Sequence, residues 1–525
     1  MSVAQKRLAI IGCGSSGLIC LKMALDFLTN SGNGKWEIVC YEQSNSITGC
    51  WGNPYPGFVS TSTRYATQFA CFPICEATVN PDGGACREEF FRDGEYGEYL
   101  ELFANEFNLR SYIQLNHRVE NLTRNPDGTW QLSVQGSIKK FDAVVICTGL
   151  AAKPKPIDSN VPQLSADDLN QPGGLNHIQN KKIVVMGGGE SAVDYANRLA
   201  KKALNNEVFL SLHSGVRVSP RYHPVRGVPS DFLRNRLMLS VHPDIRNRLG
   251  QIFVEWRIKY QRQFEKLFPN KNSPTDNESL EDESAKRSKE WALKLTLAAK
   301  DDLFNMFHNK SDDFLEAVGD QRIKIVGGAV DSACRDFFQF DSEERVIIEP
   351  DLLVPAIGYK STLEQLSDSK LKLADFHLGC CHAQHRGLYL VGFARPIIGN
   401  IPTISEMQAR YIFGLIAGEF QKPTEVELLQ KKELALLHKR YAKLNLESVY
   451  PVEMFPYCDK LARLMSLPVG KGWRSKLAPA TTMHYFGNDP RIQKVVEPAP
   501  IYMPVTLILF ILMMKPVDWL YRMIR

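Results

Sequence analysis

Apolar runs that end in glycine are the most regular feature of this chain. The first covers residues 8–11 and leads into the glycine-rich segment 12–17 (GCGSSG), after which apolar positions recur at helical spacing as far as residue 25. This pattern predicts a β-strand, a tight turn and an α-helix. In a dinucleotide-binding turn the first glycine permits the bend, the second lets backbone N–H groups approach a pyrophosphate, and the third allows the helix to pack closely on the strand.

An acidic residue after the second apolar run supports this interpretation. Residues 36–41 predict the next strand, and Glu42 closes it, at the place where a carboxylate binds the ribose hydroxyls of a dinucleotide. A glycine turn in an ordinary α/β protein is the alternative. Strand, turn, helix and acid together favour a dinucleotide-binding domain.

The remainder of the first domain alternates loops with regular elements. Residues 49–57 are too rich in glycine and proline for a helix or strand and predict a structured loop. The hydroxyl-rich segment 60–65 follows, and we expect it near the reactive ring of the cofactor, with a solvated polar turn as the alternative. Residues 97–108 predict an amphipathic helix, 112–134 alternating strands, and 141–149 a buried strand that ends in Thr-Gly.

A second unit repeats the pattern of the first. Residues 181–186 predict a strand, 187–192 (GGGESA) a turn, and 193–204 a helix, with alanine in place of the third glycine. The next strand, 208–212, has no acid at its end and leads into a basic segment instead. That favours a cofactor with a 2′-phosphate, hence NADPH, although a solvated basic face is the alternative. One site is therefore predicted to hold FAD and the other NADPH.

Beyond the second unit the pattern changes and then returns. Residues 225–310 predict charged, aromatic-bearing helices around a polar, mobile segment at 272–286. Strand patterns reappear at 322–326, 350–357 and 388–391. The last strand leads to Gly392 and to a helix over 405–417, which we expect to close over the flavin. The first domain is therefore predicted to be discontinuous.

The C-terminal tail is the most apolar segment. Residues 499–514 carry no charge, and Lys515, Trp519, Tyr521 and Arg522 follow. Sixteen helical residues span about 24 Å, less than the roughly 30 Å of a bilayer core. We therefore expect insertion into one leaflet rather than a clean span, with a buried core helix as the alternative.

Composition and charge exclude some classes of protein. A chain of 525 residues holds two or three domains, and its net charge of +5 shows no nucleic-acid footprint. Twelve unevenly spaced cysteines are typical of reduced intracellular thiols. The segment 379–385 (GCCHAQH) lacks the usual spacing of metal ligands, so we predict no metal site and interpret it as a surface loop.

The quoted segments resemble one family over nearly the whole chain. They are similar to class B flavoprotein monooxygenases and, among these, to the flavin-containing monooxygenases. The shared segments are GCGSSG, Glu42, Gly49-Cys50-Trp51, Cys147-Thr148-Gly149, GGGESA, Gly358-Tyr359, residues 390–410 and residues 455–462 (FPYCDKLA). The apolar tail resembles the endoplasmic-reticulum membrane anchor of the animal enzymes.

The resemblance implies a reaction. NADPH reduces FAD, the reduced flavin forms a C4a-hydroperoxide with O2, and one oxygen atom passes to a soft nitrogen or sulfur atom of a small molecule. A Baeyer–Villiger monooxygenase acting on ketones and an uncoupled NADPH oxidase releasing hydrogen peroxide are the alternatives. The sequence contains no GxSxG segment, the motif that would indicate a nucleophilic triad.

Two departures from the family pattern affect this reaction. The family's Phe-x-Gly-x3-His-x3-aromatic signature is absent, and residues 164–168 occupy its approximate place. Thr61 stands where the nitrogen- and sulfur-oxygenating enzymes carry asparagine. An alignment on Tyr55-Pro56-Gly57 instead places Thr61 where the ketone-oxygenating enzymes carry a catalytic aspartate.

The prediction is an α/β fold with two Rossmann-like dinucleotide-binding domains, a helical insertion and a hydrophobic C-terminal helix. The FAD domain is predicted to cover 1–152 and 330–445, and the NADPH domain 153–329 with a helical insertion at about 225–310. A C-terminal extension follows at 446–498, and the membrane-anchoring tail covers 499–525. Expected partners are a small-molecule substrate, O2 and a membrane, with an oligomer possible. The resemblance places the catalytic body on the cytosolic side of the endoplasmic reticulum.

The predicted site residues follow from the motifs and the resemblance. Thr61 is the predicted residue at the reacting oxygen. The predicted FAD-binding residues are Gly12, Cys13, Gly14, Ser15, Ser16, Gly17, Glu42, Gln43, Cys50, Trp51, Thr61, Ser62, Val119, Thr148, Gly149 and Gly392. The predicted NADPH-binding residues are Gly187, Gly189, Glu190, Ser191, Ala192, His213, Ser214 and Arg217, with Arg221 nearby.

Overall fold

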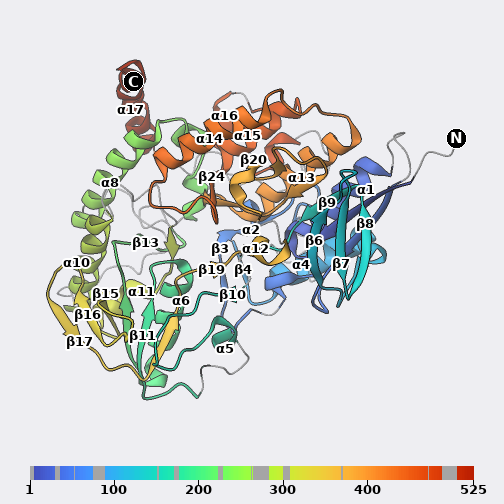
Figure 1. Ribbon diagram of the computed structural model, residues 1–525. Coiled ribbons are helices and arrows are strands. Elements are labelled where there is room, and N and C mark those ends of the chain that lie inside the picture. Colours follow the sequence, from blue (N-terminus) through green and yellow to red (C-terminus); the bar gives the residue numbers. More distant parts are fainter. Residues whose placement is uncertain are drawn as a thin grey trace, which may run out of the picture. The chain divides into compact units, whose positions relative to one another are not determined.

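The chain folds into two compact units, each described by itself below (Figure 1). The computed structural model describes residues 5–29, 36–52, 54–74, 89–150, 153–170, 175, 177–222, 229–261, 263, 283–299, 308–367, 371–470, 472–479, 481–486 and 505–524. Unit 1 comprises Met1–Ala152, Arg234–Leu237 and Ser361–Ile501, and unit 2 comprises Lys153–Leu233, Met238–Lys360 and Tyr502–Arg525.

Unit 1 is built on a mostly parallel sheet. Its strand order is β20-β21-β22-β9-β1-β2-β5, and the central strand β1 pairs in parallel with β2 on one side and β9 on the other. The strands of this sheet are β1 (Lys6–Ile11), β2 (Trp36–Tyr41), β5 (Ile113–Gln114), β9 (Ala143–Ile146), β20 (Phe376–His377), β21 (Cys381–His382) and β22 (Leu388–Leu390). Parallel strands buried on both faces require continuous apolar runs, which is the pattern of β1 and β9.

Helices and smaller sheets complete unit 1. Its helices are α1 (Ser15–Leu28), α2 (Arg64–Thr67), α4 (Glu95–Glu106), α12 (Leu363–Leu366), α13 (Ile401–Ala417), α14 (Val426–Arg440), α15 (Met454–Leu464) and α16 (Gly472–Leu477). Its other strands are β3 (Val59–Thr63), β4 (Phe90–Arg92), β6 (Val119–Arg124), β7 (Trp130–Val134), β8 (Ser137–Phe141), β23 (Ala394–Ile398) and β24 (Tyr450–Glu453). Helix α13 packs along α1. It begins four residues earlier than the predicted 405, because Asn400 caps its first turn and Pro402 is accepted there.

Unit 2 contains the second sheet, in the order β17-β16-β15-β12-β11-β18. Its strands are β11 (Lys182–Met186), β12 (Glu207–Ser211), β15 (Ile323–Ala329), β16 (Asp336–Gln339), β17 (Arg345–Ile347) and β18 (Leu352–Pro355), with the short strands β10 (Lys153–Pro154), β13 (Val218–Ser219), β14 (Asn309–Lys310) and β19 (Tyr359–Lys360) outside it. Its helices are α5 (Ala166–Asn170), α6 (Glu190–Leu199), α8 (Pro243–Lys259), α10 (Glu283–Ala298), α11 (Phe314–Gly319) and α17 (Val505–Ile524), and α7 (Arg236–Leu239) contains the boundary between the units.

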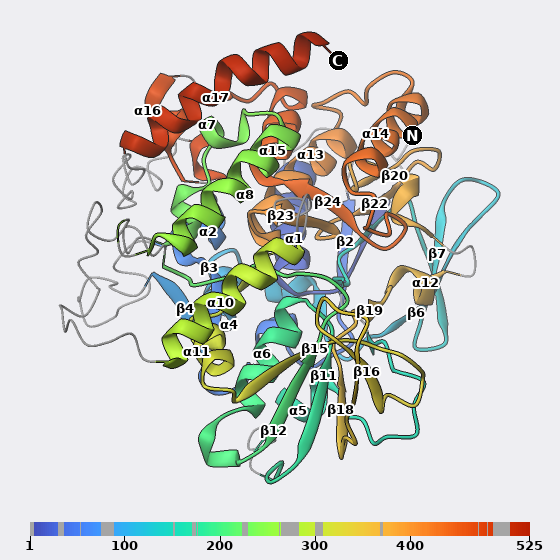
Figure 2. The ribbon, with the colours of Figure 1, turned by 90° about the vertical axis from the view of Figure 1, so that its left-hand side faces the viewer.

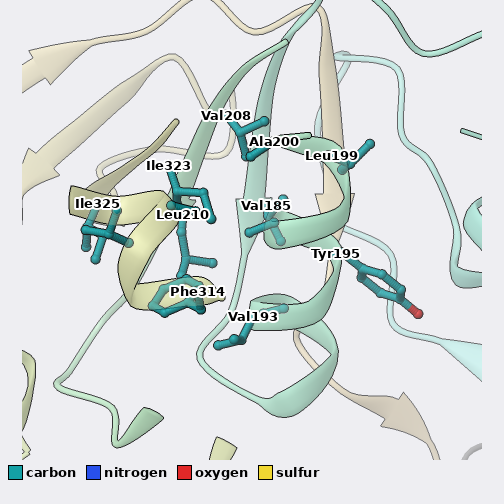
Figure 3. Close-up of a cluster of buried hydrophobic side chains, with 14 of the residues drawn as sticks. Val185, Val193, Tyr195, Leu199, Ala200, Val208, Leu210, Phe314, Ile323 and Ile325 are labelled. Carbon is teal, nitrogen blue, oxygen red and sulfur yellow. The ribbon is translucent and has the colours of Figure 1, made fainter. Parts of the chain in front are cut away.

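The core of unit 2 lies between α6 and the parallel strands. Val193 and Leu199 of α6 are buried together with Val185 of β11 and Leu210 of β12 (Figure 3). Helices α10 and α11 lie side by side (Figure 2), and Phe314 of α11 enters the same cluster. Burial of this apolar face holds the turn before α6 against the ends of the strands.

The return to unit 1 occurs later than predicted. We placed it at residue 330, but unit 2 extends to Lys360. The physical reason is strand pairing: β18 lies beside β11 in parallel, so the predicted strand at 350–357 completes the second sheet.

The sequence predicts a surface loop over 379–385, but residues 379–382 are buried, and only residues 383–385 reach the surface. Cys380 is 0% exposed and Cys381 3% exposed, because β21 is paired on both sides, with β20 and β22. Burial lowers the pKa of His382 to about 4, so this imidazole is neutral at pH 7. Among the described residues, no group of three or more His, Cys, Asp or Glu side chains is arranged to hold a metal ion.

The C-terminal helix differs from the predicted apolar tail. α17 continues through Pro516 to Ile524, so Lys515, Asp518 and Arg522 belong to the helix. None of the helices described is both long enough and apolar enough to cross a membrane. Of the predicted mobile segment, 272–282 lies outside the described residues, and 283–286 begin α10.

Candidate functional site

The turn between β1 and α1 has the conformation that the sequence predicts. Gly12 has φ +95°, and a Cβ added there would lie 2.8 Å from the carbonyl oxygen of Cys147. A Cβ on Gly17 would lie 1.9 Å from the carbonyl oxygen of Gly12. Both positions therefore require glycine. Gly12 allows the backbone conformation of the turn, and Gly17 allows α1 to pack closely against that turn.

Glu42 lies directly beside this turn. Its Oε2 accepts the backbone N–H of Cys13 at 2.8 Å, and its Oε1 accepts the N–H and the hydroxyl of Ser44, both at 2.8 Å. The carboxylate is buried (8% exposed). It is therefore fixed at the end of β2, where the sequence predicts the ribose contact.

The first turn of α1 is open to an anion. No side chain caps the helix, and its first turn contains no acidic residue, so the N-terminal N–H groups are left for a ligand. The hydroxyl of Tyr96 on α4 is buried and lies close to the Ser15 hydroxyl at the start of α1. Burial raises the pKa of this phenol well above its usual value, so it remains a donor. An uncapped helix with a buried phenol beside its first turn fits the pyrophosphate of FAD.

Several other predicted residues gather around the same turn. A Cβ on Gly12 would also lie 3.2 Å from the Cα of Thr148, and the Thr148 hydroxyl contacts that of Thr362 at 2.9 Å. A Cβ on Gly392 would lie 2.3 Å from the Ser16 hydroxyl. Gly149 has φ +77°. The strand end at 147–149 and the turn at 392 therefore converge on the first motif.

The loop after β2 covers the turn from another side. A Cβ on Gly49 would lie 3.1 Å from the Cα of Gly14, and the rings of Trp51 and Tyr96 make an edge contact at 4.9 Å between centroids. Gln43 and Cys50 are exposed. Val119, in contrast, is buried at the start of β6.

Thr61 lies on β3, away from any described hydrogen-bond partner for its hydroxyl. Both Thr61 and Ser62 are partly exposed, and the Ser62 carbonyl accepts the Ser60 hydroxyl at 2.7 Å. The following helix α2 is tied to the start of α13, since the Asn400 side chain donates to the Ala66 carbonyl at 2.6 Å. The segment predicted near the flavin ring is thus connected to the helix predicted to close over it.

Unit 2 contains a comparable turn. Gly187 has φ +130°, and a Cβ there would lie 2.3 Å from the carbonyl oxygen of Ala356. Gly189 and Glu190 are exposed, Ser191 is partly exposed, and no side chain caps α6. Ala192 is fully buried. The backbone N–H groups of this helix are again left for a ligand.

The basic segment after β12 is only partly available to a phosphate. His213 and Ser214 are exposed and Arg217 is partly exposed. Arg221, however, pairs with Asp312 through Nη1 at 2.9 Å and its own N–H. Its charge is therefore already compensated.

Two buried polar residues, Tyr96 and Glu406, are not among the predicted site residues. Tyr96 directly precedes the amphipathic helix predicted over 97–108, and no local signal marks its hydroxyl. Glu406 of α13 is fully buried and accepts the N–H groups of Ala70 and Cys71 at 2.6 and 3.1 Å. Only the folded structure reveals that both side chains are buried.

Known proteins are similar to this chain over most of its length. The model of the family "Flavin-binding monooxygenase-like" matches residues 5–300. Dimethylaniline monooxygenase [N-oxide-forming] 2 of Rattus norvegicus is 26% identical over 87% of this chain and 82% of its own length, and 4-hydroxybenzoate brominase (decarboxylating) of Marinomonas mediterranea is 25% identical over 88% and 84%.

Solved structures share the fold at lower identity. A closed crystal structure of cyclohexanone monooxygenase superposes with a TM-score of 0.59 at 16% identity, covering 88% of this chain and 98% of that chain. S-allyl-L-cysteine S-oxygenase from Allium sativum superposes with a TM-score of 0.55 at 17% identity, covering 90% and 91%.

Proposed function

Because the chain belongs to the flavin-binding monooxygenase-like family, we propose that it inserts one oxygen atom of O2 into a soft nitrogen or sulfur atom of a small molecule. It is a flavin-dependent monooxygenase with FAD and NADPH as cofactors. When bound, these groups supply the reducing equivalents and the activation of O2. The turn at 12–17 in unit 1 would hold the pyrophosphate of FAD, and the turn at 187–192 in unit 2 that of NADPH, so that each unit is a Rossmann-like dinucleotide-binding domain.

The preference for nitrogen or sulfur rests on the composition of β3. The strand contains hydroxyl side chains but no ionisable one, and the next residue, Arg64, is paired with Glu95. A soft nucleophile needs a protected oxygen donor and no charged catalytic group beside it. Oxygenation of ketones, by the resemblance, uses an aspartate at the place of Thr61. The name of the rat relative, an N-oxide-forming enzyme, supports the same choice.

Product analysis tests this proposal. The full-length protein is given NADPH and O2 with a tertiary amine, a thioether or a cyclic ketone, and products, NADPH and peroxide are measured together. We expect an N-oxide and a sulfoxide in proportion to NADPH consumed. An ester from the ketone would support the Baeyer–Villiger alternative, and peroxide equal to NADPH with every substrate would support the oxidase.

Thr61→Ala is expected to increase the hydrogen peroxide released per NADPH consumed. The Thr61 hydroxyl has no described partner within the protein, so it remains available as one donor near the reacting oxygen. Loss of one such hydrogen bond, worth about 1 kcal/mol, corresponds to about a fivefold change in the ratio of peroxide to product. Stoichiometry with a thioether substrate measures it.

Thr61→Ser is the matched control for this variant. It keeps the hydroxyl and removes a methyl group, so we expect the coupling of the unchanged protein. Equal coupling in Thr61→Ala and Thr61→Ser would remove Thr61 from the mechanism.

We also propose that α17 lies on a membrane surface, with the endoplasmic reticulum as the first membrane to examine. One face of the helix is held within unit 2: Asp518 accepts the His242 N–H at 2.8 Å, and the Tyr521 hydroxyl donates to Asp244 at 2.6 Å. The other face is apolar and exposed, with Trp519 at 61% and Met523 at 66%. Apolar and aromatic side chains beside basic ones suit the interface of an anionic bilayer.

Flotation with vesicles of phosphatidylcholine and phosphatidylserine measures this binding. The variant Trp519→Ser/Leu520→Ser is expected to lose most of the floating fraction, since both side chains are exposed on α17. Leu436→Ser removes a leucine from α14 that is more exposed (69%) than Leu520 (52%), and it serves as the control. Equal flotation of the two variants would mean that α17 does not bind the lipid.

A further inference from the structure

The C-terminal motif at 455–462 has no role in the site described so far. It forms most of α15, and Tyr457 within it is buried (6% exposed). The Tyr457 hydroxyl donates to the carbonyl oxygen of Leu378 at 2.6 Å. Leu378 has φ +57°, an unfavourable conformation for a residue with a side chain. Tyr457 therefore holds a strained turn in place.

The Tyr457 hydroxyl is also connected to the turn at Gly392, through the side chain of Gln408. Gln408 of α13 donates from Nε2 to the Tyr457 hydroxyl at 2.8 Å, and its Oε1 accepts the backbone N–H of Gly392 at 3.1 Å. Gln408 is 0% exposed. If the Gln408 side-chain amide were turned over, its NH2 group would face the Gly392 N–H, and two donors would meet. The orientation with Oε1 toward Gly392 is therefore the one that the hydrogen bonds require.

Gly392 is the point at which this chain of hydrogen bonds meets the phosphate-binding turn. It has φ +85°, and a Cβ there would lie 2.3 Å from the Ser16 hydroxyl. Ser16 lies in the first turn of α1, and its hydroxyl also contacts that of Ser405 on α13 at 2.9 Å. A displacement of Gly392 by a fraction of an ångström would therefore change its packing against Ser16 in the first turn of α1.

We propose that Tyr457 and Gln408 are positioning residues for FAD, because they fix the Gly392 turn beside Ser16 through one continuous chain of hydrogen bonds. From Gly392 N–H to Gln408, from Gln408 to Tyr457, and from Tyr457 to the Leu378 carbonyl, every donor points the same way, an order in which successive hydrogen bonds strengthen one another. Burial raises the pKa of Tyr457 well above its usual value, so the phenol stays protonated and the chain intact at neutral pH. The proposal rests on the binding of FAD in unit 1 but not on any substrate.

Release of FAD from the full-length holoenzyme tests this role. Gln408→Met keeps the length of the side chain and removes both hydrogen bonds, so we expect FAD to leave about tenfold faster. Tyr457→Phe breaks the chain one step further away, and an increase of about threefold is expected. Tyr411→Phe is the control. It removes a hydroxyl from a residue of α13 that is buried (1% exposed) but takes no part in this series of hydrogen bonds, so FAD should leave at the unchanged rate.

Two further measurements separate positioning from general packing. Hydrogen exchange of a peptide that contains Gly392 should accelerate in Gln408→Met and Tyr457→Phe but not in Tyr411→Phe. The double variant should release FAD no faster than Gln408→Met, because both changes act on the same amide. If Tyr457→Phe lowers the unfolding midpoint while FAD release and exchange at Gly392 stay unchanged, Tyr457 only packs α15 and the proposal is wrong. None of these measurements requires turnover, so a protein that oxygenates no substrate leaves the test intact.

Discussion

Replacing Gly17 by alanine is expected to release FAD from the full-length protein. A Cβ on Gly17 would lie 1.9 Å from the carbonyl oxygen of Gly12, so α1 must move away from the turn. Overpacking of this kind costs about 1–3 kcal/mol in stability, and the movement withdraws the N–H groups of α1 from the pyrophosphate. We expect the dissociation constant of FAD to rise at least about 100-fold, equivalent to about 2.7 kcal/mol. Flavin fluorescence during equilibrium dialysis measures it.

The second turn of the chain provides the matched control. Ala192 occupies in unit 2 the place that Gly17 occupies in unit 1, and it is fully buried. Ala192→Gly is expected to cost about 1 kcal/mol through helix propensity and to leave FAD binding unchanged. Should Gly17→Ala bind FAD as tightly as the unchanged protein, the turn at 12–17 would not be the FAD site.

The elements set by local chemistry could be predicted from the sequence. The strand predicted at 36–41 coincides with β2, and the first glycine turn leads into α1 as expected. The second turn leads into α6, which covers Glu190–Leu199 rather than the predicted 193–204. In these segments the deciding interactions lie within a few residues, because a glycine with positive φ and an apolar period act over one turn or strand. Glu42 was predictable for the same reason, since its position follows from the end of β2.

The elements set by distant partners could not be predicted. The segment 379–385 has the composition of a loop, yet pairing of β21 with β20 and β22 buries its first half, residues 379–382. In α13 the polar residues Glu406 and Gln408 are fully buried, although an amphipathic pattern would place such side chains outside. Their partners lie far away in sequence, at residues 70–71 and 457. A sequence pattern contains no record of such pairs.

Glu406→Ala is expected to cause the largest loss of stability in unit 1. The carboxylate accepts the N–H groups of Ala70 and Cys71, the Thr482 hydroxyl at 3.1 Å and Arg410 Nη2 at 3.0 Å. Removing it leaves four donors without a partner, one of them a cation. Breaking a buried ion pair from one side costs about 3–5 kcal/mol. The urea concentration at the unfolding midpoint of unit 1, monitored through the release of FAD, should fall by about 1–2 M.

Glu406→Gln separates the charge of this residue from its shape. A carboxamide fills the same space but offers only one acceptor oxygen, so it can satisfy either the Ala70 and Thr482 donors or those of Cys71 and Arg410. We therefore expect a midpoint between those of the unchanged protein and Glu406→Ala. Glu447→Ala breaks an exposed pair with Lys372 and should leave the midpoint unchanged, because exposed pairs contribute little. If Glu406→Ala behaves like Glu447→Ala, the segments at 70–71 and 482 are held to α13 by apolar packing rather than by this carboxylate.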